Sequence, residues 1–341
     1  MTLQKGLGYH RLSPQEQQAY TIILNAFSAT ATIFDSSHIN SKVDIMKVLQ
    51  VALNDNPSVI YFDKTKIHTL QSFFGKQIEL SGVPPKSQIK KMAAALDAKA
   101  NSIVATIQKS GGDAYTQILR VYEYLQEHTK YDQKELSIIS KGRTGRPTAH
   151  NAYGALIEDL AVCSGFSGAF ALLIQKLGFE SMTVTGRSTH RSVGFAEHAW
   201  NIIKVNNRCY HMDLTWDTNQ YAELGMHSYD YFALDDEEIA NDHDWDINTT
   251  PACSYNDLSY YLKSGLYANT KDRLDDILEN CSKNRDKPIR VKLSLNIMLP
   301  QDAGEYIAQL LFTKTEKAGG SVSLNYWWNE HNRCFTAKFI P

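Results

Sequence analysis

The sequence is poor in cysteine and has no paired cysteine motif. Its five cysteines are odd in number, and no C-x-x-C spacing occurs; they are Cys163, Cys209, Cys253, Cys281 and Cys334. This pattern argues against a disulfide framework and against a structural zinc site. Reduced thiols are typical of the cytoplasm, so we expect a cytoplasmic protein, with secretion as the alternative if a leader has been removed.

The sequence also lacks long apolar runs and a strong charge of either sign. It has no stretch of about 18 apolar residues such as a membrane helix needs. Its opening, MTLQKGLGYHRLSPQEQQ, has no apolar signal-peptide core. A net charge of -2 over 341 residues provides no basic field for nucleic acid or an anionic membrane. We therefore expect neither as a partner, and the oligomeric state stays open.

Helical patterns fill most of the first third of the chain. The Ser-Pro-x-Glu signal at 13–16 is typical of a helix start, and Asn56-Pro57 ends a second helical pattern. The predicted elements are helices from 13, from 44, at 85–108 and at 113–130, and strands at 59–63 and 68–81. We expect residues 1–110 to form a mainly helical amino-terminal region.

The rest of the chain mixes helices and strands. Residues 133–148 carry Gly, Pro, Arg and Lys without periodicity, which predicts an exposed loop. A helix at about 164–177, a strand at 180–188 and a hairpin of strands at 197–205 and 208–217 then complete a predicted core at residues 111–250. Helices and strands that alternate over residues 251–341 predict a small α+β carboxy-terminal domain, so the fold class is α+β.

Cys163 stands where the long apolar helix begins. Unpaired N–H groups and the positive end of the helix dipole favour a thiolate there. Gly165 and Gly168 lie on the first turns of this helix, although glycine costs about 1 kcal/mol relative to alanine in a helix interior. We expect the hairpin to press on the helix at these glycines. A cysteine in this setting is a candidate nucleophile.

The hairpin allows a test of register. If Asn206-Asn207 is the two-residue turn, Trp200 lies opposite Asp213. Side chains alternate along strands, so His198 and His211 share that face, and His198 is the diagonal neighbour of Asp213 at about 7–8 Å between Cα atoms. Asp213 can therefore orient the imidazole of His198. If the thiol of Cys163 docks against this ring, the three form a nucleophile, a base and an orienter.

Three segments of the sequence resemble the bacterial transglutaminase-like superfamily, whose core is papain-like. They are YGALIEDLAVCSGFSGAFALLIQKLGF, HAWNIIKVNNRCYHMDLTWD and YDYFALDDEEIANDHDW. The resemblance implies a cysteine nucleophile at Cys163, a base at His198 and an orienter at Asp213, which attack an amide of a peptide or protein through a thioester. No cofactor and no metal is required. The family has hydrolases, acyltransferases and members that are not enzymes.

The resemblance also implies an oxyanion site made by the N–H of Cys163 and one side-chain donor, for which Tyr153 is the candidate. Trp200 and Trp216 are candidates for the walls of the substrate cleft, and packing of the hairpin is the favoured role for both. We expect the substrate specificity to reside in loops such as 133–148 and 186–197.

Several alternatives stay open. His190 or His211 competes with His198 as the base, and Asp217 competes with Asp213 as the orienter. A metal site is a further alternative, because His190, His198, His211 and Asp213 cluster in the sequence. It would leave the placement of Cys163 unexplained. The alternative function is a non-catalytic binding module on the same scaffold, acting through its carboxy-terminal domain.

Overall fold

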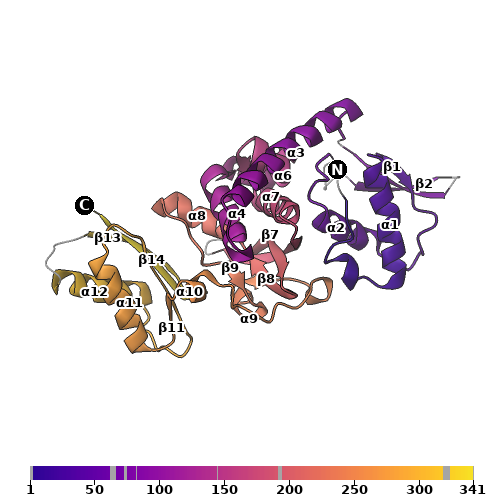
Figure 1. Ribbon diagram of the computed structural model, residues 1–341. Helices are drawn as coiled ribbons and strands as arrows, with labels where there is room; N and C mark the ends of the chain where they lie inside the picture. Colours follow the sequence, from indigo (N-terminus) through magenta and orange to yellow (C-terminus); the bar gives the residue numbers. More distant parts are fainter. Residues whose placement is uncertain are drawn as a thin grey trace. The chain divides into compact units, whose positions relative to one another are not determined.

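The structure is a computed structural model that describes residues 3–61, 67–72, 75–81, 83–143, 145–190, 194–317 and 323–340. It divides into two compact units, Met1–Thr215 with His243–Cys253, and Trp216–Asp242 with Ser254–Pro341. Figure 1 follows the chain by colour through both units. Helices and strands are mixed throughout, so the predicted α+β class is confirmed. The three domain ranges drawn from the sequence stay predictions.

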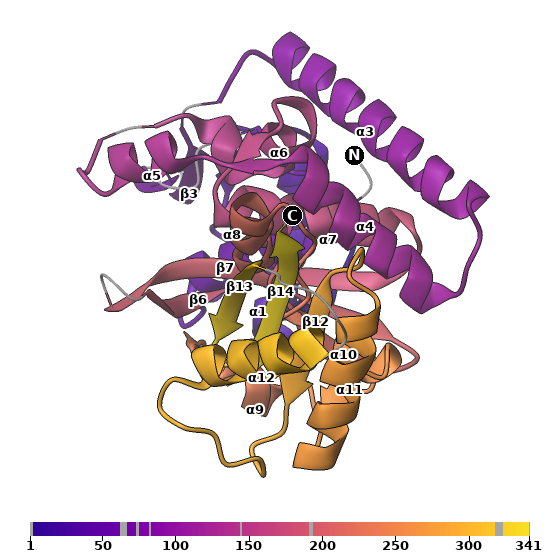
Figure 2. The same ribbon diagram turned by 90° about the vertical axis from the view of Figure 1, so that its left-hand side faces the viewer.

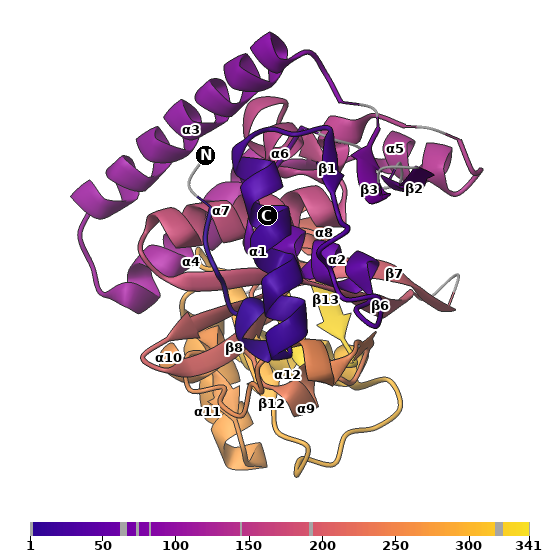
Figure 3. The same ribbon diagram turned by 90° about the vertical axis from the view of Figure 1, so that its right-hand side faces the viewer.

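The first unit begins with two helices on a small sheet. Helix α1 (Pro14–Ser28) starts with a capping box made by Ser13 and Glu16, and α2 (Ile45–Asp55) is capped by Asp44. Figure 3 shows both helices beside β1 (Ile33–Asp35), the edge strand of a sheet of order β1-β3-β2. Their apolar faces share one core. The two predicted helices are confirmed.

Two strand predictions in this region are wrong. The predicted strand at 68–81 is a hairpin of β2 (Ile67–Ser72) and β3 (Gly75–Leu80), with residues 73–74 outside the described residues. The predicted strand at 59–63 has no extended ladder over residues 59–61, and 62–63 lie outside the described residues. Val59, Ile60 and Tyr61 are buried, and the apolar run reflects this burial.

Helices then surround the segment that carries Cys163. The predicted helices α3 (Lys86–Lys109) and α4 (Ala114–His128) are confirmed, and α3 packs along α6 (Ala152–Ile157), as Figure 2 shows. Helix α7 (Cys163–Lys176) begins one residue before the predicted start. Two short strands, β4 (Lys130–Tyr131) and β5 (Leu160–Ala161), pair in parallel just ahead of α7.

The predicted loop at 133–148 is wrong in its first half and at its end. Helix α5 (Gln133–Ile139) occupies the first half, because the side chain of Asp132 accepts the Glu135 N–H and caps the helix. The 3-10 helix η2 (Pro147–His150) ends the segment. Residue 144 lies outside the described residues. The capping residue Asp132 was the local sequence signal for this helix, and the loop-like composition of residues 133–148 obscured it.

A long antiparallel sheet lies against α7. Strands β6 (Glu180–His190), β7 (Gly194–Val205), β8 (Arg208–Met212) and β10 (His243–Asp244) follow the order β10-β6-β7-β8. The turn residues Asn206 and Asn207 both have positive φ, 50° and 62°, as the two-residue turn requires. The predicted register is confirmed from Val205 opposite Arg208 to Asn201 opposite Met212.

Strand β8 is shorter than predicted. The expected strand continued through Asp217, but helix α8 (Leu214–Leu224) begins directly after Asp213. The Asp213 carboxylate accepts the Thr215 N–H, which is the local bond that turns the chain from strand to helix. Asp213 therefore lies at the junction of the two elements.

The glycines of α7 approach a different neighbour from the expected one. A Cβ on Gly165 would lie 2.4 Å from the Ala149 carbonyl oxygen, and one on Gly168 would lie 3.3 Å from the Ala152 nitrogen. The close backbone is therefore that of η2 and α6, and the predicted pressure from the hairpin at these glycines is wrong. The hairpin meets α7 at Ser167, whose hydroxyl donates to the Ala199 carbonyl oxygen.

The second unit has its own core. Its sheet has the order β11-β12-β14-β13, made of β11 (Tyr267–Ala268), β12 (Ile289–Leu293), β13 (Ser323–Asn329) and β14 (Cys334–Ile340). Helices α11 (Lys271–Lys283) and α12 (Ala303–Lys317) bury their apolar faces in its core cluster. The remaining elements are β9 (Phe232–Leu234), α9 (Asp236–Ile239) and α10 (Tyr260–Lys263).

Among the helices that the structure describes, none has the length and apolar character needed to cross a membrane.

The contrast between Gly165 and Gly168 leads to a stability prediction. Gly165→Ala should lower the free energy of unfolding by about 1–3 kcal/mol, because its Cβ would overlap a fixed backbone oxygen. Gly168→Ala is the matched control, since its looser contact is offset by a gain of about 1 kcal/mol in helix propensity. Urea unfolding measures both, and equal losses in the two variants would contradict this packing.

Candidate active site

Cys163 is the first residue of α7 and is partly exposed. The residue before it, Val162, makes no side-chain cap, so no side chain covers the first turn from the capping position. The unpaired N–H groups of a helix start favour an anion. The predicted setting of the thiol at a helix start is confirmed.

His198 projects from β7 toward Asp213. Its Nε2 lies 2.6 Å from the Asp213 Oδ2, and only 8% of its side chain is exposed. The side chain of Cys163 also acts on this histidine, by a hydrogen bond and by charge, and raises its pKa. The imidazole thus bridges a sulfur and a carboxylate that are distant in the sequence.

The pKa of His198 is raised to about 10. Burial by itself lowers the pKa of an imidazole, but the negative charge of Asp213 and the hydrogen bond to it outweigh this, and Cys163 acts in the same direction. His198 therefore holds its proton at neutral pH. A thiolate beside this imidazolium is electrostatically stabilised.

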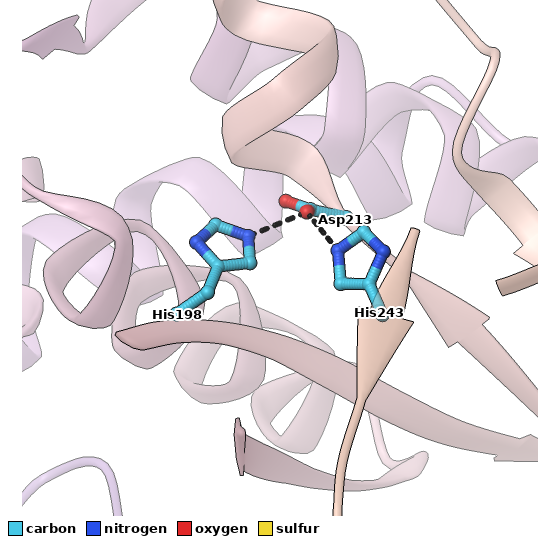
Figure 4. A group of neighbouring side chains, drawn as sticks. All are labelled: His198, Asp213 and His243. Atoms are coloured by element: carbon cyan, nitrogen blue, oxygen red, sulfur yellow. Dashed lines mark hydrogen bonds and ion pairs between the residues drawn. The ribbon is translucent and has the colours of Figure 1, made fainter. Parts of the chain in front are cut away.

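Asp213 is completely buried and accepts bonds at both oxygens. Oδ2 lies 2.6 Å from His198 Nε2 and 3.0 Å from His243 Nε2, as Figure 4 shows, and Oδ1 accepts the Thr215 N–H at 2.9 Å. Burial raises the pKa of a carboxyl, but the two histidines more than reverse this and hold the pKa of Asp213 well below its usual range. The carboxylate stays ionised.

His243 was not predicted from the sequence. It lies on β10, which pairs with β6, and its side chain is as buried as that of Asp213. Its ring meets that of Trp200 edge to face at 4.9 Å between centroids. Its sequence signal is its place in the polar NDHDW segment, 30 residues beyond Asp213.

Trp200 and His211 form a pair beneath His198. Trp200 is fully buried, stacks on His198 at 6.0 Å between centroids, and donates from Nε1 to the His211 Nδ1 at 2.9 Å. Its burial agrees with the favoured packing role. The Nδ1 of His211 accepts a hydrogen bond from Trp200, whereas the Nε2 of His198 is hydrogen-bonded to Asp213. The geometry therefore favours His198 over His211 as the base.

The other predicted residues are less closely tied to Cys163. Tyr153 lies in the first turn of α6, where its N–H donates to the Asn151 Oδ1, and its role at an oxyanion stays a prediction. Asp217 and Trp216 belong to the second unit. Asp217 accepts N–H groups from Asp230 and Tyr231 there, so its rival role as orienter has no support.

Tyr131 is a neighbour of Cys163 that the sequence did not indicate. Its Cα lies opposite Ala161 in the β4–β5 pair, and its ring stacks on Phe166, one turn along α7, at 6.4 Å between centroids. Burial raises the pKa of Tyr131, and the charges of Cys163 and Asp213 raise it further. The phenol of Tyr131 therefore stays protonated at neutral pH.

The geometry of His198, Asp213 and His243 fits hydrogen bonds better than a metal. Their ligand atoms lie within 4.8 Å of one another. Tetrahedral zinc ligands at 2.0–2.2 Å from the ion stand about 3.4 Å apart, whereas the nitrogen atoms here lie 2.6 and 3.0 Å from one carboxylate oxygen. The side chain of His190, a ligand in the predicted alternative, lies outside the described residues.

Comparison with known proteins identifies one domain of the chain. A family profile described as Transglutaminase-like superfamily matches residues 101–214. Similar solved structures include a TGase, at 13% identity and a TM-score of 0.34 over 44% of this chain and 43% of that one. A candidate cysteine protease from Cytophaga hutchinsonii has 13% identity and a TM-score of 0.28 over 44% and 61%.

The chain thus spans less than two thirds of each of these two structures. Comparison with curated proteins finds no match.

The ion pair predicts how the histidine titrates. NMR of the ring C–H signals should find a pKa near 10 for His198, and Asp213→Asn should lower it, because the largest source of the upward shift is removed. Asp35→Asn, in an exposed pair with His38, is the control and should leave His198 unchanged. A pKa that is equal in the wild type and in Asp213→Asn would contradict the pairing.

The same shift predicts a pH dependence of stability. The native state holds the His198 proton more tightly than the unfolded chain, so this contribution is fully present below pH about 6.5 and disappears as the pH rises through about 10. The lowered pKa of Asp213 adds a contribution that is lost only as the pH falls below its ordinary value. The destabilisation by Asp213→Asn in urea should therefore shrink between pH 6.5 and 10.

Proposed function

On the premise that residues 101–214 form a transglutaminase-like superfamily domain, we propose that the protein is a cysteine-nucleophile amide hydrolase or acyltransferase acting on peptides or proteins. The observation that carries the proposal is the imidazole of His198, which interacts with Cys163 on one side and with the buried carboxylate of Asp213 on the other. Nucleophile, base and orienter in this order are the elements of covalent acyl transfer.

The chemistry follows from the charges. The Cys163 thiolate attacks an amide carbonyl carbon, and a C–S bond forms while the carbonyl electron pair moves to oxygen. The His198 imidazolium then gives its proton to the leaving amine as the C–N bond breaks. The product is a thioester on Cys163. Attack by water gives hydrolysis, and attack by an amine gives transfer.

The negative oxygen of the intermediate requires donors. We assign this role to the N–H groups at the start of α7, with Tyr131 or Tyr153 as the side-chain donor. The interaction of Tyr131 with the charge of Cys163 supports it over Tyr153, whose hydroxyl has no described link to the sulfur.

His243 has a positioning role in this scheme. It makes the second imidazole bond to Asp213 Oδ2, which fixes the carboxylate and keeps it ionised. Removing one partner of a buried charge pair typically costs about 3–5 kcal/mol. His243 thus keeps Asp213 available to orient His198.

Selective alkylation tests the nucleophile. Iodoacetamide at neutral pH should label Cys163 at least about tenfold faster than Cys281, since both are partly exposed but burial raises the pKa of Cys281. His198→Gln should remove most of the difference by removing the imidazolium. Labelling of both cysteines at one rate would instead favour a non-catalytic binding module.

Products test the reaction class. Glutamine-containing peptides are incubated with wild type or Cys163→Ala, with and without a primary amine, and their masses are measured. Deamidated peptides, shortened peptides or amine adducts would each define one member of the proposed class, and all should be absent with Cys163→Ala. Unchanged peptides in every reaction, with Cys163 unreactive, would contradict the proposal.

A further inference from the structure

One hydroxyl joins the backbone of Cys163 to the backbone beside His198. The Ser167 Oγ lies 2.9 Å from the Cys163 carbonyl oxygen, one turn back along α7, and 2.9 Å from the Ala199 carbonyl oxygen on β7. Ala199 directly follows His198 in the chain. A serine hydroxyl has one proton to donate, so the two carbonyl oxygens share it. Ser167 thus connects the first turn of α7 to the part of β7 that carries His198.

Asn201 makes the reciprocal connection from the sheet. Its Nδ2 donates to the Ser167 carbonyl oxygen at 3.0 Å and to the Met182 carbonyl oxygen on β6 at 3.3 Å. Both neighbours can only accept, so the nitrogen of the amide must face them, and the orientation of this side chain is fixed. Asn201 therefore joins α7, β7 and β6 at one point. We call Ser167 and Asn201 the α7–β7 link.

The α7–β7 link places polar groups in an apolar environment. Ser167 is 2% exposed and Asn201 is 1% exposed. All of α7 is described, and its other buried residues have no polar side chain; they are Gly165, Phe166, Gly168, Ala169, Phe170, Ala171, Leu172, Leu173 and Ile174. The Asn201 Oδ1 is buried and has no hydrogen-bond partner among the described residues, which costs free energy. An apolar residue of similar volume would avoid this cost, so packing alone does not require the link.

The hydrogen bonds of the link fix how α7 lies along β7. Apolar contacts are non-directional and tolerate small slides of a helix on a sheet. Hydrogen bonds weaken steeply when their angle is distorted. The link crosses between the two elements in both directions, from the Ser167 hydroxyl to a strand carbonyl and from the Asn201 amide to a helix carbonyl. A slide of α7 along β7 would distort both bonds.

The interaction of Cys163 with His198 depends on this register. The imidazole is held by the sheet, because its Nε2 lies 2.6 Å from the Asp213 Oδ2 at the end of β8, whereas the thiol belongs to the first residue of α7. The two side chains interact by a hydrogen bond and by charge, so their separation depends on the position of α7 on β7. A misplacement of about 1 Å can lower a catalytic rate by about 10²-fold.

We propose that Ser167 and Asn201 are positioning residues that keep the Cys163 thiol within reach of the His198 imidazole. This inference rests on the proposed function and adds to it the contacts that fix the geometry of the nucleophile and the base. Both residues act through the backbone of α7 and β7. No bond to the substrate is made or broken at either side chain.

The other end of α7 provides a matched control. The Gln175 Nε2 donates to the Ser181 carbonyl oxygen on β6 at 2.8 Å and to the Asp55 carbonyl oxygen at 3.0 Å. This amide, like that of Asn201, thus joins α7 to the sheet by hydrogen bonds to backbone. It lies about 18 Å along the helix from Cys163. Gln175→Leu should therefore remove comparable bonds and lower stability without moving the thiol.

Two variants test the link. Asn201→Leu keeps a similar side-chain volume and removes both amide hydrogen bonds, and Ser167→Ala removes only the hydroxyl. At neutral pH each should slow the alkylation of Cys163 by iodoacetamide, measured against Cys281 in the same sample, by about 10- to 10²-fold. The burst of p-nitrophenolate from p-nitrophenyl acetate, which reports acylation of the thiol, should slow by a similar factor. Gln175→Leu should leave both rates unchanged.

The pKa of His198 is a readout that a loss of stability alone would not move. In Asn201→Leu and Ser167→Ala, NMR should find this pKa below the wild-type value of about 10, because the contribution of Cys163 is lost. It should stay above 6.5, because the larger contribution of Asp213 remains. In Gln175→Leu it should equal the wild-type value.

The contrary outcomes separate this inference from the proposed function. Urea unfolding identifies which variants are folded, and either Asn201→Leu or Ser167→Ala suffices. Wild-type rates and a wild-type pKa of His198 in a folded variant of the link, or an equal loss of rate in Gln175→Leu, would overturn the positioning role alone. A wild type whose Cys163 is alkylated no faster than Cys281, and which shows no burst, would overturn the proposed function and this inference with it.

Discussion

The candidate active site depends on one buried carboxylate, that of Asp213. It lies at the end of β8, where it ends the strand by accepting the Thr215 N–H and holds two imidazoles on its other oxygen. A charge at this depth without partners would cost several kcal/mol. The chain leaves the first unit after Thr215 and returns at His243, the residue that supplies the second imidazole. The segment that returns to the first unit therefore supplies one of the hydrogen bonds that stabilise the buried Asp213 carboxylate.

Close backbone approaches place the groups around this carboxylate and around the thiol. Gly186 on β6 lets the backbone of β10 come near, since a Cβ there would lie 2.4 Å from the Asp244 carbonyl oxygen. Gly165 does the same for η2 and α7. At Gly186 the missing side chain lets β10 bring His243 within hydrogen-bond distance of Asp213. Rigid positioning of this kind, more than the identity of the acid or base, determines whether an imidazole can serve chemistry.

Local sequence signals were sufficient to predict most of the β7–β8 hairpin and the pairing of His198 with Asp213. The Asn206-Asn207 turn sets the register, and alternation along β7 then brings His198 to Asp213. His243 could not be found in this way, because nothing within its own segment indicates pairing with β6. The loop prediction failed at Asp132, where one capping side chain outweighs the poor helical periodicity of the residues that follow. Gly165 and Gly168 indicated that another backbone lies close to α7. The sequence does not show which segment that is, because the neighbour can come from any part of the chain.

Asp213 and Glu135, two buried carboxylates of the first unit, are satisfied in different ways. Asp213 is completely buried and meets two imidazoles on one oxygen, so a positive charge on His198 directly offsets its cost. Glu135 shares a backbone N–H between both oxygens and has one imidazole at the longer distance of 3.2 Å, with that ring partly open to water. Glu135 is therefore satisfied mainly by the fixed backbone around it, and Asp213 by two side chains that come from different strands.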